Sequence, residues 1–202
     1  MNFIKNILPL IFLLCFVYAN AQQKIVLING NEIPIKSYVV NADNIIYKKA
    51  NDKKDKTKTV EKLDVFSIVK EDSTEEMIYQ SDTLTFTVEE ARNYIRGEQA
   101  ASIYYKKPSI TGGAGIFGVA ASLLSFYSLP IPMIYGVVIG RFNPPKMQIP
   151  KGYDAPYSST EAYRYGYNKK ARNIKIQQSL KWGYIGLGFG LAGLIVYGVS
   201  SL

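Results

Sequence analysis

Two stretches of this chain carry no charged side chain, and both are long enough to cross a lipid bilayer. Residues 108–140 form a charge-free run of 33, and residues 182–202 form a second run of 21. A helix needs only about 20 apolar residues to span the hydrocarbon core. The sequence therefore predicts a membrane protein with transmembrane segments at 108–140 and 182–202.

Both segments are rich in glycine, and small residues let helices approach closely in lipid. The glycines expected at helix contacts are Gly112, Gly115, Gly118, Gly186, Gly190 and Gly193. Their spacing leaves open whether these contacts lie within one chain or between chains. Pro130 and Pro132 interrupt the first segment, which leaves two arrangements: one long kinked span, or a helix, a break and a second half-helix ending near Gly140.

The first 21 residues have the pattern of an export signal. Lys5 precedes an apolar run from Ile7 to Tyr18, and Ala19-Asn20-Ala21 has the small-x-small spacing that signal peptidase cleaves. We expect a signal peptide at 1–21 that is cleaved after Ala21. An uncleaved anchor is the alternative, although the apolar run is short for a span.

Residues 22–83 predict an exported module of short antiparallel strands. Apolar runs at 25–27 and 33–35 flank Asn29-Gly30-Asn31, where a tight hairpin needs a residue with positive φ. Further runs at 38–40, 44–48, 57–60, 65–69 and 77–80 are separated by Asn, Asp, Lys or Ser. The charged stretch 53–56 is expected to be a solvated turn.

From Val88 the apolar period changes to that of a helix, and we expect an amphipathic helix within 84–107. Ala91, Tyr94, Ile95 and Ala101 share one face. Its end and the start of the second charge-free run carry aromatic and basic residues of the kind that settle at a lipid-water interface. The expected interface anchors are Tyr104, Tyr105, Lys106, Lys107, Lys181, Trp182 and Tyr184.

The net charge of +8 belongs almost wholly to residues 141–181, which hold nine basic and two acidic residues. The first part of this region is rich in proline and should be irregular. A second amphipathic helix should begin near Ser159 and carry residues that pair with anionic lipid head groups. These expected head-group ligands are Lys169, Lys170, Arg172 and Lys175. We do not expect nucleic acid as a partner.

Export and charge bias predict the same topology. A cleaved signal places the β-module outside the cytoplasmic membrane, and positively charged loops stay on the cytoplasmic side. Residues 141–181 are then cytoplasmic and Leu202 returns to the outer side. A segment that enters and leaves on one side at Pro130–Pro132 would reverse the placement of this loop.

Two segments resemble each other faintly. Tyr94-Ile95-Arg96-Gly97 and Tyr163-Arg164-Tyr165-Gly166 are each followed by an alanine and then by a glycine-rich apolar run. Two copies of a helix followed by a membrane segment would fit, and chance similarity fits as well. We base no expectation on this similarity.

Several motifs together resemble a family of uncharacterised envelope proteins from Bacteroidota. The matching stretches are Ile25 to Lys49, Val88 to Ala101, Tyr104 to Lys106, Gly112 to Pro132 and Gly166 to Ala171. The resemblance implies membrane association and a β-module that precedes the helices. It implies no activity.

The residues that remain for chemistry are few. Histidine is absent, and the only cysteine, Cys15, lies in the expected signal peptide. We therefore expect no catalytic, metal or cofactor site, and we assign Glu89, Glu90 and Glu98 to the helix surface.

The overall prediction is an α+β membrane protein: a small antiparallel β-module, amphipathic helices and a two-segment transmembrane hairpin. It would sit in the inner membrane with the module in the periplasm, as a structural or interaction unit that contacts lipid and an envelope partner or a second copy. The alternative is a small oligomeric pore or transport accessory.

Overall fold

The computed structural model describes residues 22–80, 86–106, 108–142, 145–150, 152–153 and 156–200. The chain divides into two units, Met1–Val88 and Glu89–Leu202, and each is described by itself. The expected signal peptide, residues 1–21, lies outside the described residues.

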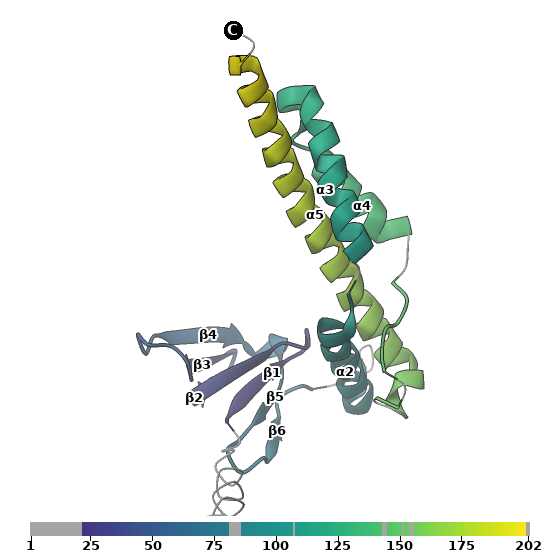
Figure 1. Cartoon of the computed structure of the whole chain (residues 1–202). Coiled ribbons are helices and arrows are strands. Elements are labelled where there is room, and N and C mark those ends of the chain that lie inside the picture. Colours follow the sequence, from purple (N-terminus) through teal and green to yellow (C-terminus); the bar gives the residue numbers. More distant parts are fainter. Residues whose placement is uncertain are drawn as a thin grey trace, which may run out of the picture. The chain divides into compact units, whose positions relative to one another are not determined.

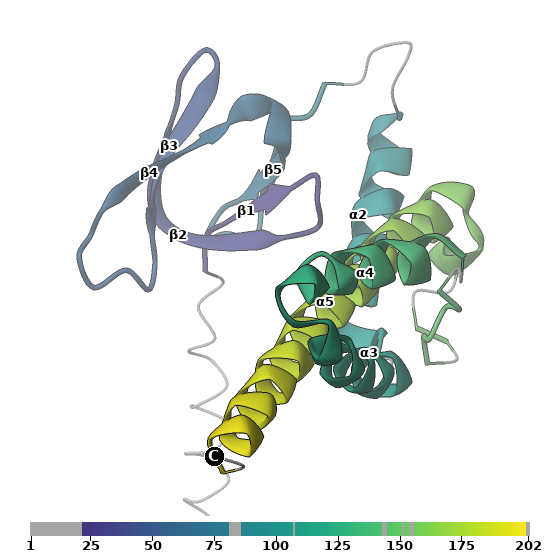
Figure 2. The same cartoon turned by 90° about the horizontal axis from the view of Figure 1, so that it is seen from above.

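The first unit is an antiparallel sheet of six short strands, as its runs of β-branched and aromatic residues predict. The strands are β1 (Lys24–Leu27), β2 (Glu32–Val40), β3 (Asn44–Lys49), β4 (Thr57–Glu61), β5 (Val65–Val69) and β6 (Glu75–Met77). Their order in the sheet is β4-β3-β2-β1-β5-β6 (Figures 1 and 2).

The hairpin between β1 and β2 is confirmed. Gly30 has a φ of +75°, the left-handed conformation that the turn requires. Its N–H donates to the carbonyl of Leu27 over 3.0 Å, and Leu27 donates to Asn31 over 2.9 Å. The turn thereby fixes the register that pairs Ile25 with Ile33.

Strand β2 joins the two halves of the sheet, because it pairs with β1 on one side and with β3 on the other. Its register against β3 shifts between Ile35 and Ser37, and Figure 2 shows the strand curving across the module. A bulge of this kind bends a strand and increases its twist. The bend brings both halves onto one core, formed by Ile25, Ile35, Ile45, Tyr47, Val65 and Ile68.

The last strand differs from its expected position at 77–80. β6 ends at Met77, because the N–H groups of Ile78 and Tyr79 both donate to the carbonyl of Phe66, over 3.0 and 2.9 Å. Two residues that share one acceptor cannot continue a regular ladder.

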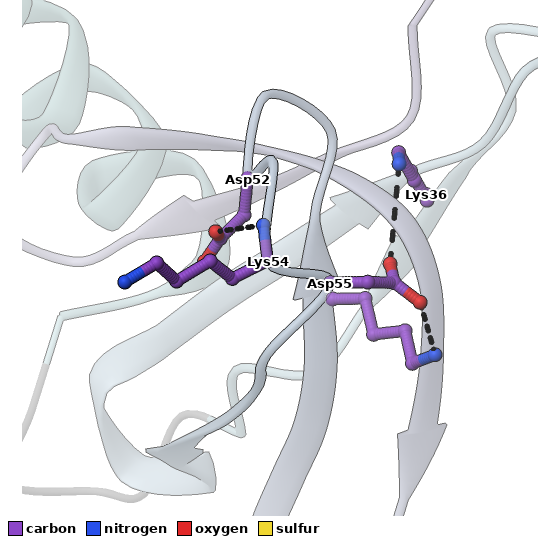
Figure 3. A network of polar contacts seen from close by, with 5 residues as sticks. Lys36, Asp52, Lys54 and Asp55 are labelled. Atoms are coloured by element: carbon purple, nitrogen blue, oxygen red, sulfur yellow. Dashed lines mark hydrogen bonds and ion pairs between the residues drawn. The ribbon is translucent and has the colours of Figure 1, made fainter.

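The charged loop between β3 and β4 is held by its own side chains (Figure 3). Asp55, which has a φ of +48°, pairs with Lys48 at 2.7 Å and with Lys36 at 3.9 Å. The hydrogen bond from Lys48 lowers the pKa of Asp55. Asp52 accepts from the backbone N–H of Lys54 over 3.0 Å. These exposed pairs fit the expected solvated turn.

The second unit is helical. Its elements are α2 (Val88–Tyr104), α3 (Pro108–Ala121), the 3₁₀ segment η2 (Ser122–Ser128), α4 (Ile131–Phe142), η3 (Tyr157–Ser159) and α5 (Glu161–Ser200). The amphipathic helix is confirmed in α2, which buries Ala91, Tyr94, Ile95 and Ala101. Thr160 lies before α5 in an extended conformation, and its hydroxyl accepts from the N–H of Tyr163 over 3.4 Å.

Residues 108–140 do not form the single long span. They form a helix, a break and a second helix, the other of the two expected arrangements. α3 has 14 residues and α4 has 12, both fewer than the roughly 20 that cross a bilayer. Among the described residues, one helix, Glu161–Ser200, is long and apolar enough to span. The expected pair of spanning segments is therefore corrected to one long helix and a broken one.

Candidate functional site

The helical unit is built on two close crossings along α5. In the first, α2 meets the N-terminal half of α5. A Cβ added to Gly97 would overlap the carbonyl oxygen of Tyr163, and a Cβ added to Gly166 would overlap that of Tyr94. Each helix thus presents a glycine to a backbone carbonyl of the other helix. On both helices this glycine follows, by three residues, the residue whose carbonyl meets the other glycine.

The second crossing repeats this geometry between α3 and α5. A Cβ on Gly118 would overlap the carbonyl oxygen of Gly183, and a Cβ on Gly186 would overlap that of Gly115. Such approach of backbones permits Cα–H···O contacts and dense packing, which hold helices together in lipid. The contacts lie within one chain, one of the two possibilities that the spacing left open.

The faint repeat in the sequence corresponds to the first crossing. The two similar segments, 94–97 and 163–166, pack against each other. Gly97 and Gly166 are not among the expected contact residues, because they precede the apolar runs. Their matched position three residues after a tyrosine was the signal that could have found them.

Four of the six expected packing glycines lie at α3–α5 contacts. Besides Gly118 and Gly186, Gly115 lies near the backbone of Trp182, and Gly190 meets Ser122 and Val119. The other two make no such contact within the described part of the chain, where a Cβ added to Gly112 or to Gly193 would meet no atom within 4 Å.

Helix α4 runs along α5 in the direction opposite to α3. The order of its contacts shows this. Pro132 lies 3.0 Å from the Cβ position of Gly183, the Cβ position of Gly136 lies 3.2 Å from Leu180, and that of Gly140 meets Ile176. α3 runs parallel to α5, since Gly115 is near Trp182 and Ser122 is near Gly190. Residues 108–140 therefore run along α5 toward its C-terminus and then return to the middle of the helix, near Arg172 (Figure 1).

Lys175 is corrected from a lipid ligand to an internal cap. Its side chain is 2% exposed, and its Nζ donates to the carbonyl oxygen of Ile139 over 2.6 Å. Ile139 is among the last four residues of α4, whose carbonyls have no partner inside their own helix. A cation there also matches the negative end of the helix dipole. Lys175 thus fastens the returning helix to α5.

Replacing Lys175 by methionine should lower the free energy of unfolding of the helical unit by about 1–3 kcal/mol, because the carbonyl of Ile139 loses a charged donor in a buried place. SDS titration of the detergent-solubilised chain, followed by circular dichroism, measures this. Lys181→Met is the matched control, since Lys181 is exposed. Equal stability of the two variants would contradict the capping role.

A buried polar cluster joins α2 to α5. The hydroxyl of Tyr94 donates to Glu98 Oε1 over 2.5 Å, and Lys169 Nζ donates to the Tyr94 oxygen over 2.8 Å. Glu98 is 3% exposed, so its expected surface position is corrected. Its other carboxylate oxygen, Oε2, has no hydrogen-bond partner. Lys169 remains exposed, but its ammonium is held by Tyr94.

Tyr105 is corrected from an interface anchor to a core residue. It is 3% exposed and belongs to a cluster with Ala100, Ala101, Tyr163, Tyr167 and Ala171. Among the residues that the structure describes, its hydroxyl has no hydrogen-bond partner. The Tyr167 hydroxyl accepts from the N–H of Gln148 over 2.8 Å, which ties the irregular loop to this cluster.

Burial raises the pKa of Tyr94, Tyr105 and Tyr167 above the ordinary tyrosine value of 10.0, and the hydrogen bond to Glu98 raises that of Tyr94 further. Above pH 10 the unfolded chain therefore releases protons that the folded chain keeps. The unfolded state then binds fewer protons, so the stability of the helical unit should fall as pH rises beyond 10.

Denaturant titrations at about pH 9 and about pH 11 measure this loss. Tyr105→Phe removes one titrating hydroxyl without breaking a hydrogen bond, since that hydroxyl has none. This variant should lose less stability between the two pH values than the unchanged chain. An identical pH dependence for both proteins would contradict the prediction.

Beyond these contacts, large apolar side chains cover the outside of α3, η2, α4 and the C-terminal half of α5. The most exposed are Ile116, Leu123, Tyr127, Ile134, Val137, Phe189, Ile195, Val196, Tyr197 and Val199. Monomeric soluble proteins rarely expose contiguous apolar surface on this scale. The surface of the helical unit is thus suited to an apolar surrounding.

Of the remaining expected interface residues, Lys181, Trp182 and Tyr184 lie at the start of the charge-free part of α5, and Tyr104 lies at the end of α2. Trp182 and Tyr184 are 41% and 40% exposed, and the Tyr184 hydroxyl donates to the carbonyl of Leu129 over 3.2 Å. Tyr104 is half-buried and stacks edge-on against Tyr153. Lys107 lies outside the described residues. We define the basic collar as Lys106, Lys169, Lys170, Arg172 and Lys181, of which Lys170 is half-buried and the others are exposed.

The ends of the three apolar helices meet at this collar. α3 begins just after Lys106, and the charge-free part of α5 begins just after Lys181. α4 returns so that the Cβ position of Gly140 lies 4.0 Å from the Arg172 side chain. Segments distant in the sequence therefore change from charged to apolar at the same end of the bundle. Comparison with known protein families, curated proteins and solved structures finds no match to this chain.

Proposed function

We propose that this chain is an integral membrane protein of the bacterial envelope that holds its β-module at the bilayer surface as a structural or interaction unit. The observation that carries the proposal is the shared boundary at the basic collar. On one side of it lie the cations, and on the other lies an apolar surface whose exposure to water is unfavourable.

The dimensions support one span and one re-entrant hairpin. Residues 182–200 of α5 would extend about 28 Å at 1.5 Å per residue, close to the roughly 30 Å of a hydrocarbon core. α3 and α4 would enter from the collar side and return to it. The side chain of Lys181, directed toward the helix N-terminus, can reach the interface from its position at the edge of the core.

The proposal places residues 141–181 on the same side of the bilayer as the β-module. α2 precedes the hairpin and the first half of α5 follows it, yet these helices share the Gly97–Gly166 crossing and one buried cluster. Because α2 and the first half of α5 pack against each other outside the bilayer, both must lie on the same side of it. An export signal at 1–21 would make that side the periplasm and the bilayer the inner membrane.

The pore alternative has less support. It needs polar groups that face a path through the helices. Ser122 and Ser179 are 2% and 0% exposed, and their hydroxyls donate to the carbonyls of Val119 and Lys175 in their own stretch of chain, over 2.7 and 2.9 Å. Both hydroxyls are thus satisfied within the fold.

Flotation of cell membranes in urea at neutral pH tests the proposal, and the unchanged chain should float with lipid. The double variant Phe189→Arg and Ile195→Arg should remain in the soluble fraction, because each arginine costs about 3 kcal/mol in the core. Both side chains are exposed, at 73% and 68%, so the internal packing is kept. Leu63→Arg, at an 84% exposed site of the β-module, should float like the unchanged chain. Release of the unchanged chain by urea would refute the proposal.

A further inference from the structure

The helical unit narrows along α5 with distance from the basic collar. Gly183 has neighbours on two sides, Gly118 of α3 and Pro132 of α4. Seven residues further on, the three atoms nearest to the Cβ position of Gly190 belong to Ser122 and Val119, at the C-terminal end of α3 and the start of η2. Residues 192–200 of α5 are all exposed, and its C-terminal end extends beyond the other helices of the unit (Figure 1).

This narrowing has a scale comparable to one lipid leaflet. Gly190 lies eight residues beyond Trp182, or about 12 Å along the helix, and half of a hydrocarbon core is about 15 Å. At the level of Gly183 to Gly190, the leaflet next to the collar therefore holds α5 together with the second half of α3, the start of η2 and the start of α4. One helix occupies the far part of the opposite leaflet.

A protein whose cross-sectional area is larger in one leaflet than in the other fits a bilayer that is convex on the side of the larger area. The difference arises from backbone segments, the second half of α3, η2 and the start of α4, and not from mobile side chains. We propose that the helical unit prefers curved membrane, convex on the side of the basic collar. This inference rests on the proposed membrane insertion, and it names the membrane shape that this surface fits.

The exposed cations of the basic collar lie at the wide end of the apolar surface, next to the leaflet that would be convex. Lys106, Lys169, Arg172 and Lys181 surround the wide end of the apolar surface and are exposed. Curvature separates lipid head groups in the convex leaflet, which opens space for the hairpin beneath them. Membrane binding of wedge-like apolar helices with a basic face depends on curvature for this reason.

The experiment reconstitutes the full chain in vesicles of about 30 nm and about 200 nm diameter, made of neutral lipid with a minority of anionic lipid. Cys15→Ser and Asn168→Cys provide one fluorophore at the collar, since Asn168 is exposed and precedes Lys169 on α5. An impermeant quencher then reports the fraction of molecules with the collar outward. Molecules facing inward in the same vesicles experience the opposite curvature and serve as the internal control.

The collar-outward fraction should be about two-fold higher in the small vesicles than in the large ones. Equal fractions in vesicles from which urea does not extract the chain would overturn the curvature preference and leave the proposed insertion intact. A chain that urea extracts from vesicles of both sizes would overturn the insertion, and the curvature preference with it.

Discussion

Replacing Gly97 or Gly166 by alanine should lower the free energy of unfolding of the helical unit by about 3 kcal/mol. An added methyl group at either site would overlap a backbone carbonyl of the other helix, and the atoms at 2.9 Å beyond it also belong to backbone. A carbonyl cannot rotate away as a side chain can. The two helices would have to separate, which opens the cluster around Tyr163 and Tyr167.

The two substitutions act on one crossing, so their effects should not add. Once one methyl group has forced the backbones apart, the second meets less resistance, and the double variant should cost well below the sum of the single variants. SDS titration in detergent, followed by circular dichroism, gives all three values. Additive effects would indicate that the glycines act separately and not through a shared approach.

Gly112→Ala and Gly193→Ala are the matched controls. Both sites lie in helices with no atom within 4 Å of the added methyl group. Alanine favours a helix over glycine by up to about 1 kcal/mol, so these variants should match or exceed the stability of the unchanged chain. A loss at these sites as large as that at Gly97 would show that the contacts are not the cause.

The elements with a strong local signal could be predicted from the sequence. Alternating apolar residues indicated the strands, and Gly30 marked the hairpin because its backbone must adopt a positive φ. Glu89 and Glu90 in the first turn and an apolar face indicated α2. These signals depend on neighbours in the sequence, and the structure bears them out.

The errors concern long-range packing. Lys175 has the sequence surroundings of a surface lysine, and only the return of α4 places an unpaired carbonyl within reach of its ammonium group. Tyr105 ends a helix in an aromatic and basic stretch that suits a membrane interface, yet α5 covers it. The return of α4 itself depends on Gly136 and Gly140 fitting against α5, which no local pattern expresses.

Labelling of single cysteines in intact cells should place the β-module and the first half of α5 on the same side of the membrane, and the C-terminus on the other. The sites are Asp55→Cys, Asn168→Cys and Ser200→Cys in a Cys15→Ala background. An impermeant thiol reagent that passes the outer membrane should label the first two and spare the third. Permeabilised cells, in which all three react, provide the control.

The expected result opposes the positive-inside bias. The outcome depends on which is larger, the preference of the cations for the cytoplasmic side or the free energy of the packing between α2 and α5. Residues 141–181 hold nine cations, whose preference for the cytoplasmic side acts while the chain inserts. Placing them there would separate α2 from α5 and expose Tyr105, Tyr163 and Tyr167, each of which contributes about 2–3 kcal/mol when buried. It would also break the Gly97–Gly166 crossing. Labelling at positions 55 and 200 with protection at 168 would mean that charge prevails over this packing and that residues 108–140 cross the bilayer.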